Sequence, residues 1–498
     1  MTTTIDRGRS AQETASGRRG SHALRWWVLA VLGVAQLMVV LDATVVNIAL
    51  PEAQRDLGFD DASRQWVITG YALAFGSLLL LGGRLSDLFG RRNTFIVGLI
   101  GFSVASAIGG AAVNFEMLVA ARIGQGVFGA VLAPAALSLL TVTFTEPSER
   151  AKAFGIFGAV AGTGGAIGLL LGGALTEWAS WRWVMFVNLA FAAVALVGAV
   201  LLLAKHVTTT RPKLDIPGTV VVTAALFGIV YGFSHAESDG WTNSATLAFL
   251  IGGAALLGLF VWLETRVAHP LLPLRIVLDR TRGGAYLAVF VMGIGMFAIF
   301  LFLTYYMQLT LGYSPIMTGV AFLPMVAAMV ASSTTTPSLL LPKFGPKVVV
   351  STGFAIAALG MAWLTRIGLD TGYASHILPG LILLGLGLGG AMATAFQSAT
   401  AGVKHEDAGV ASAMINTSQQ VGGSIGTALL STIAASASTG YLAGRTPNEI
   451  TIVQSAIESY TTSFTWAAGI FVFGAVVLAF LLPNALPAPA EGEPVLAH

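Results

Sequence analysis

The chain has 498 residues, of which 55% are hydrophobic and only 10% are charged, and its formal net charge at pH 7 is +2. Soluble domains carry about 25% charged residues, so this composition excludes a water-facing globular surface. The absence of cysteine excludes disulfides and thiolate metal sites. The apolar segments are continuous over about 20 residues, the length of a membrane-crossing helix, whereas barrel strands would alternate. We therefore predict an all-α polytopic membrane protein.

Fourteen apolar segments predict fourteen transmembrane helices, called spans below. They lie near residues 26–50, 64–84, 94–114, 117–142, 151–175, 183–204, 216–235, 244–263, 283–308, 316–341, 347–366, 376–402, 408–434 and 462–483. The basic segment before them and the proline-rich segment after them are predicted to be disordered tails. The first span is of full length, so we expect no cleavable signal peptide.

The distribution of positive charge predicts the orientation. Twenty of the 26 lysines and arginines fall on the side of the N-terminus, five fall on the other side, and Arg122 falls inside a span. Cytoplasmic loops carry the excess of these residues. An even number of spans then places both termini in the cytoplasm.

Span 1 contains one acidic residue, Asp42. It precedes Pro51 by nine residues, which is more than two helical turns from the outer end. An ionised carboxylate inside hydrocarbon costs several kcal/mol, so we expect Asp42 to gain and lose a proton near neutral pH. Proton coupling requires such a group. The alternative is a helix-end aspartate that reaches the interface or is held by a neighbour.

The connection between spans 2 and 3 is short and highly charged. It reads Leu81-Gly82-Gly83-Arg84-Leu85-Ser86-Asp87-Leu88-Phe89-Gly90-Arg91-Arg92. Because backbone and charged groups in a tight hairpin need partners, we predict a specific contact that gates transport. The candidate gating residues are Gly83, Arg84, Asp87, Gly90, Arg91 and Arg92. The alternative is a loop that only sets the orientation of the chain.

Arg122 in span 4 is the only basic residue in the interior of a predicted span, and it needs a partner or a water-filled cavity. Gln125 lies three residues later, on the same helix face. An intramembrane arginine near an intramembrane aspartate suggests charge competition, in which the proton on Asp42 decides whether Arg122 is neutralised. The alternative is a static structural ion pair.

Span 5 carries a glycine motif formed by Gly164, Gly168, Gly172 and Gly173. Glycines at a spacing of four let helices approach closely, and close packing alone is the simpler interpretation.

Two sequence matches indicate an internal repeat. Residues 164–168 (GGAIG) recur as 422–426 (GGSIG), and residues 89–92 (FGRR) recur more weakly as 344–347 (FGPK). Such a repeat is typical of transporters with their site between two halves, although glycine-rich helices also resemble one another by chance. The predicted organisation is a cytoplasmic tail at 1–24, a six-helix bundle at 25–204, two inserted helices with linkers at 205–282, a six-helix bundle at 283–483 and a cytoplasmic tail at 484–498.

Polar residues within the spans are candidates for lining a substrate cavity. They are Gln125, Asn188, Gln308, Asn416 and Gln419. The histidines fall in loops, tails or span ends, and the sequence contains no HExxH, Walker loop or GxGxxG fingerprint. We therefore expect no metal, cofactor, catalytic residue or nucleic-acid partner, and no nucleotide-driven pump.

Together these features resemble the fourteen-span drug:proton antiporters of the major facilitator superfamily. The resemblance covers about residues 25–483 and rests on the Asp42 segment, the hairpin 83–92, Arg122-x-x-Gln125-Gly126, the glycines 164–173 and Trp181-Arg182-Trp183. Leu169 stands where the antiporter glycine motif usually has proline. Relatives that export dications carry further acids in spans 10 and 13, and residues 316–341 and 408–434 contain none.

The resemblance implies two six-helix bundles plus two inserted helices in the cell membrane, acting as a monomer. It implies a proton-coupled antiporter that exports an amphipathic drug, antibiotic or metabolite by alternating access. It also implies that Asp87 clamps against span 11 or the start of a neighbouring helix and stabilises the outward-open state. The alternative function is proton-coupled import of a nutrient or organic anion, and a pair of intramembrane arginines would favour it. A membrane sensor would need a large soluble domain, for which no loop is long enough.

Overall fold

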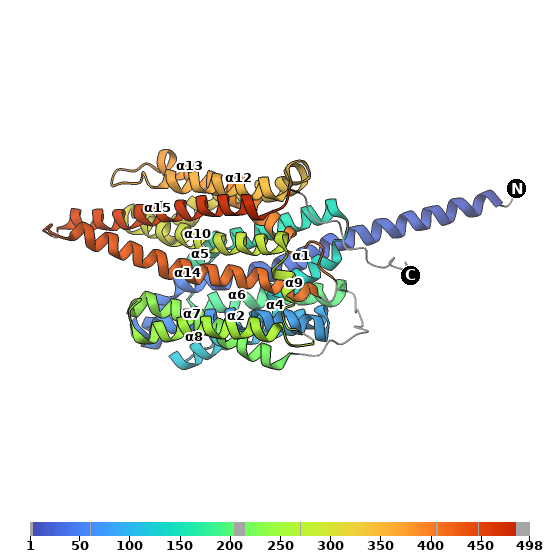
Figure 1. Cartoon of the computed structure of the whole chain (residues 1–498), viewed down its shortest axis with the longest axis horizontal. Coiled ribbons are helices and arrows are strands. Elements are labelled where there is room, and N and C mark those ends of the chain that lie inside the picture. Colours follow the sequence, from blue (N-terminus) through green and yellow to red (C-terminus); the bar gives the residue numbers. More distant parts are fainter. Residues whose placement is uncertain are drawn as a thin grey trace.

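A computed structural model describes residues 3–59, 61–203, 215–268, 270–404, 407–446 and 448–484. These residues form helices joined by short connections (Figure 1). The α-helices are α1 (Thr3–Leu57), α2 (Asp61–Phe89), α3 (Arg91–Gly110), α4 (Phe115–Thr143), α5 (Pro147–Trp178), α6 (Arg182–Leu202), α7 (Ile216–Asp239), α8 (Ser244–Glu264), α9 (Leu274–Val277), α10 (Arg280–Tyr305), α11 (Pro315–Thr335), α12 (Leu341–Leu364), α13 (Leu378–Ala399), α14 (Ala408–Leu442) and α15 (Glu449–Leu481). Three π-helical turns are η1 (Tyr306–Thr310), η2 (Thr336–Leu340) and η3 (Tyr373–Ile377).

Twelve stretches of the described residues are long and apolar enough to cross a membrane. One of them, Ile316–Leu364, contains both α11 and α12. The chain is therefore a multi-pass helical membrane protein, and the count of fourteen spans stays a prediction. Near the C-terminus the helices are longer than the predicted spans, since α14 ends at Leu442 and α15 begins at Glu449. These helices extend beyond their apolar segments because adding a residue to an existing helix costs little.

The prediction of a disordered N-terminal tail is wrong for residues 3–24, because α1 begins at Thr3. Figure 1 shows this part of α1 projecting beyond the helical bundle. The segment contains no proline, so the helix of the first span can propagate through it. The predicted C-terminal tail falls almost entirely outside the described residues.

The two halves of the chain pack in the same pattern. In the first half α1 contacts α5 and α6, α4 contacts α2 and α3, and α3 contacts α6. In the second half the corresponding pairs are α10 with α14 and α15, α13 with α11 and α12, and α12 with α15. Gly90 and Gly345, which match in the weaker repeat, both have positive φ, of 87° and 74°. The packing therefore supports the predicted repeat and our proposed division into two bundles.

The glycine motif lies against α1. A Cβ atom at Gly164 would come within 2.5 Å of Val40, one at Gly168 within 2.0 Å of the Thr44 hydroxyl, and one at Gly172 within 3.1 Å of Val45. In the second half a Cβ at Gly422 would lie 2.1 Å from the Phe290 carbonyl oxygen. Close helix contact thus requires glycine at equivalent places in both halves. Gly173 is also buried.

The two halves meet at two interfaces: α14 contacts α2 and α4, and α5 contacts α11 and α13. The inserted helices α7 and α8 lie on one side of the molecule (Figure 1), where α7 contacts both α2 and α14. The Trp241 indole after α7 donates a 2.8 Å hydrogen bond to the Thr432 hydroxyl of α14. The inserted pair therefore covers one of the two interfaces between the halves.

The topology is testable because the chain lacks cysteine. We expect an impermeant thiol reagent to label Thr242→Cys and Thr439→Cys in sealed cells, since both residues are exposed beyond the predicted outer ends of spans. It should not label Thr145→Cys, an exposed residue between α4 and α5, until the membrane is permeabilised. Labelling of Thr145→Cys in sealed cells, without labelling of Thr439→Cys, would contradict the proposed orientation.

Candidate functional site

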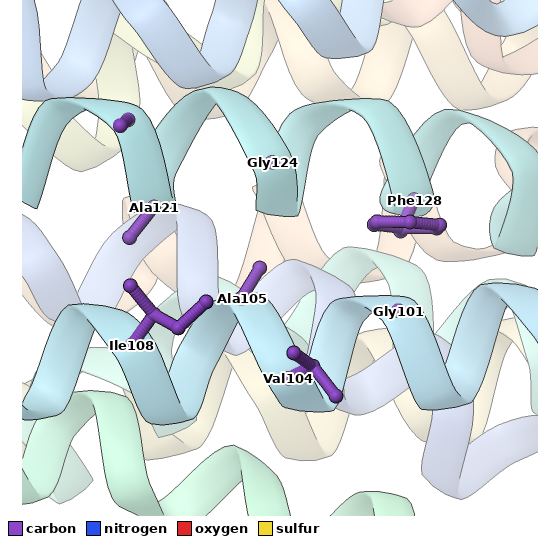
Figure 2. A pocket seen from close by; sticks show the side chains of 8 residues that line it. Gly101, Val104, Ala105, Ile108, Ala121, Gly124 and Phe128 are labelled. Atoms are coloured by element: carbon purple, nitrogen blue, oxygen red, sulfur yellow. The ribbon is translucent and has the colours of Figure 1, made fainter. Parts of the chain in front are cut away.

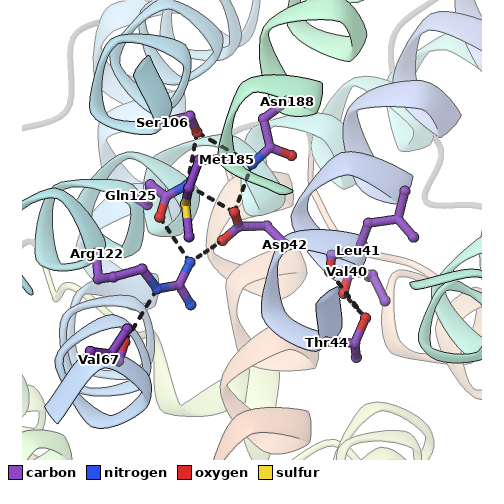
Figure 3. A network of polar contacts seen from close by, with 10 residues as sticks. All are labelled: Val40, Leu41, Asp42, Thr44, Val67, Ser106, Arg122, Gln125, Met185 and Asn188. Atoms are coloured by element: carbon purple, nitrogen blue, oxygen red, sulfur yellow. Dashed lines mark hydrogen bonds and ion pairs between the residues drawn. The ribbon is translucent and has the colours of Figure 1, made fainter. Parts of the chain in front are cut away.

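Four helices bring five polar residues together inside the first half of the chain (Figure 3). Asp42 comes from α1, Ser106 from α3, Arg122 and Gln125 from α4, and Asn188 from α6. We call these residues the Asp42 network. Each is at most 1% exposed to solvent. The sequence predicted that Asp42 and Arg122 lie in the membrane interior, and the fold places them in direct contact.

Asp42 accepts hydrogen bonds from three side chains. Its Oδ2 atom lies 2.5 Å from Arg122 Nη1. Its Oδ1 atom accepts from Gln125 Nε2 at 2.8 Å and from Asn188 Nδ2 at 2.7 Å. Three side chains from two other helices therefore converge on this carboxyl group.

Arg122 is equally well enclosed. Its Nε atom donates to the Val67 carbonyl oxygen at 3.2 Å, and Nη1 also donates to Gln125 Oε1 at 2.8 Å. The guanidinium carbon lies 4.4 Å from the centre of the Tyr71 ring, a favourable position for a cation. Removing one member of such a buried pair strands the other charge and costs about 3–5 kcal/mol. A proton can replace Arg122 as the partner of Asp42 only if the helices carrying the two residues move.

The sequence did not predict every member of this network. Gln125 and Asn188 were expected to line a substrate cavity, whereas in this structure their amides bind Asp42 and they are fully buried. Gln308 lies on η1 near the end of α10, and Asn416 and Gln419 lie half-buried on α14. These three residues are not part of the network. Ser106, which accepts from Gln125 Nε2 at 2.8 Å, had no distinguishing signal among the many serines of the chain.

The charged hairpin contacts the second half of the molecule. The Gly409 backbone N–H, at the start of α14, donates to Asp87 Oδ1 at 3.2 Å. Arg91 lies 3.6 Å from the same carboxylate. Gly83 packs against Gly409, and a Cβ atom at Gly83 would come within 2.6 Å of the Gly409 carbonyl oxygen. Asp87 thus meets the positive end of a helix dipole. Asp87 was expected to contact either span 11 or the start of a neighbouring helix, and in the structure it contacts the start of α14.

The other members of the hairpin lie in different surroundings. Arg84 is buried, with 5% of its surface exposed. Arg92 donates to the Val200 carbonyl oxygen of α6 at 3.2 Å, within its own half. Gly90 precedes α3 with its positive φ, a conformation that favours glycine.

A second contact closes the same end of the molecule, and sequence reasoning missed it. Arg150, at the start of α5, donates from Nη2 to both the carbonyl and the hydroxyl oxygen of Thr400, each at 2.9 Å. Thr400 ends α13 in the second half, so Arg150 places a cation at the negative end of that helix. Two residues of the first half therefore contact the α13–α14 connection: the acidic Asp87 meets the positive start of α14, and the basic Arg150 meets the negative end of α13. We call these contacts of Asp87 and Arg150 the cytoplasmic gate, because we propose below that this end of the molecule faces the cytoplasm and that these contacts control access to it.

The outer end of α1 is fixed separately. Asp56 accepts hydrogen bonds from Arg182 and from the Trp181 indole, the latter at 3.0 Å. The hydrogen bond from Arg182, followed by the one from Trp181, lowers the pKa of Asp56 below its usual value. Arg182 also donates to the Ala112 carbonyl oxygen at 2.9 Å. The Trp-Arg pair of the sequence thus joins the outer ends of α1, α3 and α6.

A groove of about 410 Å³ lies between α3 and α4 (Figure 2). It is lined by Gly101, Val104, Ala105, Ile108, Ala120, Ala121, Gly124 and Phe128. Val104 and Ile108 are largely exposed, and the lining offers no polar side chain for specific recognition. This groove suits contact with lipid chains, whereas the Asp42 network lies inside the bundle.

Two similar helical halves, with buried intramembrane charges inside the first, are typical of secondary transporters. The chain matches the Major Facilitator Superfamily over residues 32–427, and it belongs to that family. The human organic anion transporter MFSD10 (TETRAN) has the same fold, with a TM-score of 0.62 over 91% of this chain and 99% of that chain, at 14% identity.

The chain is also similar, over most of its length, to proteins named for antibiotic resistance or export. The puromycin resistance protein pur8 of Streptomyces alboniger is 48% identical, and the alignment covers 95% of this chain and 94% of that protein. The cephamycin export protein CmcT of Amycolatopsis lactamdurans is 38% identical over 98% and 97% of the two chains. The tetracenomycin C resistance and export protein of Streptomyces glaucescens is 34% identical over 86% and 78%.

Proposed function

We propose that this protein exports amphipathic small molecules, in particular an antibiotic or related metabolite, in exchange for protons. Similarity along nearly the whole chain to antibiotic export and resistance proteins supports the substrate class. The observation that supports proton exchange is the Asp42–Arg122 pair, because a buried carboxylate with a competing cation can exist in two charge states. The protein acts by alternating access and not as an enzyme.

The proposed cycle uses the network and the gate together. With the gate closed, the site opens to the outer side, where a proton reaches Asp42 and displaces Arg122. Loss of this attraction favours the state open to the cytoplasm. Asp42 then releases its proton, Arg122 returns, and substrate loads from the inner side. We propose Gln308, Asn416 and Gln419 as side chains that contact substrate.

We further propose a place in the cell membrane with both termini in the cytoplasm, and a monomer as the functional unit. The alternative of anion import is less well supported. An imported anion would need a cation free to bind it, and Arg122 is already neutralised by Asp42.

The function is tested by comparing drug resistance in cells with and without the protein. We expect expression to raise the inhibitory concentration of at least one of puromycin, cephamycin and tetracenomycin C several-fold. Accumulation of that compound should fall, and a protonophore should restore it. Asp370 is an exposed aspartate between α12 and α13. As a control, the variant Asp370→Asn should give the same resistance as the unaltered protein. Resistance that persists with a protonophore would contradict proton coupling, and increased uptake would contradict export.

A further inference from the structure

Two buried carboxyl groups meet at the cytoplasmic ends of the inserted helices, outside the Asp42 network. Asp215 precedes α7 and Glu264 is the last residue of α8. They are only 4% and 5% exposed, and an oxygen atom of each lies within 2.9 Å of the position that a Cβ atom at Gly218 would take. The proposed transport cycle gives them no role.

The surrounding hydrogen bonds show how the pair is built. Asp215 Oδ1 accepts from the Gly218 N–H at 2.9 Å. Glu264 accepts from the N–H groups of Leu271 and Leu272, at 3.3 and 3.1 Å. Asp215 Oδ2 is buried and has no hydrogen-bond partner among the described residues. A Cβ at Gly218 would lie 2.2 Å from this oxygen and 2.9 Å from Glu264 Oε1, so glycine leaves the space in which the two carboxyl groups meet.

Two ionised carboxylates can only accept hydrogen bonds, so buried carboxyl oxygens this close together can bind each other only through a proton on one of them. Two buried carboxylates at one site also repel each other, which favours a shared proton. The groups that act on Glu264 are Asp215 and the two leucine amides. Among the described residues, basic side chains of the adjoining elements contact other groups: Arg275 pairs with Asp407, Arg91 with Asp87, and Arg266 lies over the Trp262 ring.

We propose that Asp215 and Glu264 bind one proton between them, and that this shared proton fastens the inserted helices to the linker that leads into the second half. Leu271 and Leu272, which Glu264 holds, are buried in the core. The linker continues into α9, where Arg275 lies 2.6 Å from Asp407 at the start of α14. The carboxyl pair is thereby connected to the helix end that forms the cytoplasmic gate.

The test is the pH dependence of thermal unfolding of the purified full-length protein. The folded pair retains a proton that an unfolded chain releases above about pH 4.3, so stability should fall as pH rises from about 5 to about 8. Asp215→Asn supplies a permanent N–H donor to Glu264 and keeps the acceptor for Gly218. We expect the unfolding midpoint of Asp215→Asn to fall several degrees less over this range than that of the unaltered protein.

Asp279→Asn is the matched control. Asp279 also caps a helix, accepting from the N–H groups of Thr281 and Arg282 at 3.1 and 3.0 Å, and its ion-pair partner is Arg282. We expect Asp279→Asn to keep the pH dependence of the unaltered protein. Parallel profiles for the two variants, or failure of Asp215→Asn to fold, would overturn the proposal, since this substitution preserves every hydrogen bond of the protonated pair.

The fastening role has its own readout. Arg266 is an exposed trypsin site in the linker. As pH rises, cleavage after Arg266 should increase more in the unaltered protein and in Asp279→Asn than in Asp215→Asn. Comparing the three proteins at the same pH removes the pH dependence of the protease itself. Equal increases in all three would show that the carboxyl pair does not hold the linker.

Discussion

Asp42→Asn is expected to abolish uphill efflux driven by a proton gradient. Asparagine cannot bind and release the transported proton, and it cannot neutralise Arg122. In everted membrane vesicles, substrate-induced proton release reported by a pH-sensitive dye should fall at least tenfold. Vesicles carrying Asp42→Asn that exchange protons for substrate at the normal rate would show that coupling lies elsewhere.

A second variant separates loss of coupling from loss of folding. Asp42→Asn alone leaves Arg122 buried without its counter-charge, at a cost of about 3–5 kcal/mol. The double variant Asp42→Asn with Arg122→Gln removes both charges and leaves neutral groups that can hydrogen-bond. We expect it to be more stable than the single variant and to allow downhill substrate exchange, yet to remain uncoupled from protons. Restored proton exchange in the double variant would show that Asp42 and Arg122 form only a static structural ion pair.

Asp87→Asn is expected to open the cytoplasmic gate and lower transport without lowering expression. The variant loses a charge-assisted hydrogen bond to the start of α14, worth about 1.5–3 kcal/mol. Because alternating access depends on states of similar free energy, this loss should shift their ratio by about 10- to 150-fold. A cysteine at Ser412, which is fully buried on α14 one turn after Gly409, should react faster with a permeant thiol reagent in the Asp87→Asn background.

Arg92→Gln is the matched control for the gate. Arg92 belongs to the same hairpin, but it contacts α6 within its own half. Arg150→Gln, which removes the contact with the end of α13, should act in the same direction as Asp87→Asn. If Arg92→Gln impairs transport as strongly as Asp87→Asn while Ser412→Cys reactivity stays unchanged, the hairpin acts only through its positive charge in setting orientation.

The sequence by itself determined the class of protein and its rare interior charges. Continuous apolar segments specify membrane helices because the bilayer leaves the backbone no other partner. Asp42 and Arg122 stand out for the same reason, since ionised groups in hydrocarbon are costly and therefore few. The hairpin was recognisable because its charges and glycines are contiguous.

The tertiary structure alone decided the partners of these residues. Asp42 and Asn188 are separated by 146 positions, and no local pattern shows that their helices meet. The partners in the gate are a backbone N–H at Gly409 and a backbone carbonyl at Thr400, groups that every non-proline residue carries and that only helix ends expose. The Asp215–Glu264 pair likewise arises because α7 and α8 run antiparallel and bring their cytoplasmic ends together. Sequence marks where burying a charge is costly, whereas packing decides which group compensates it.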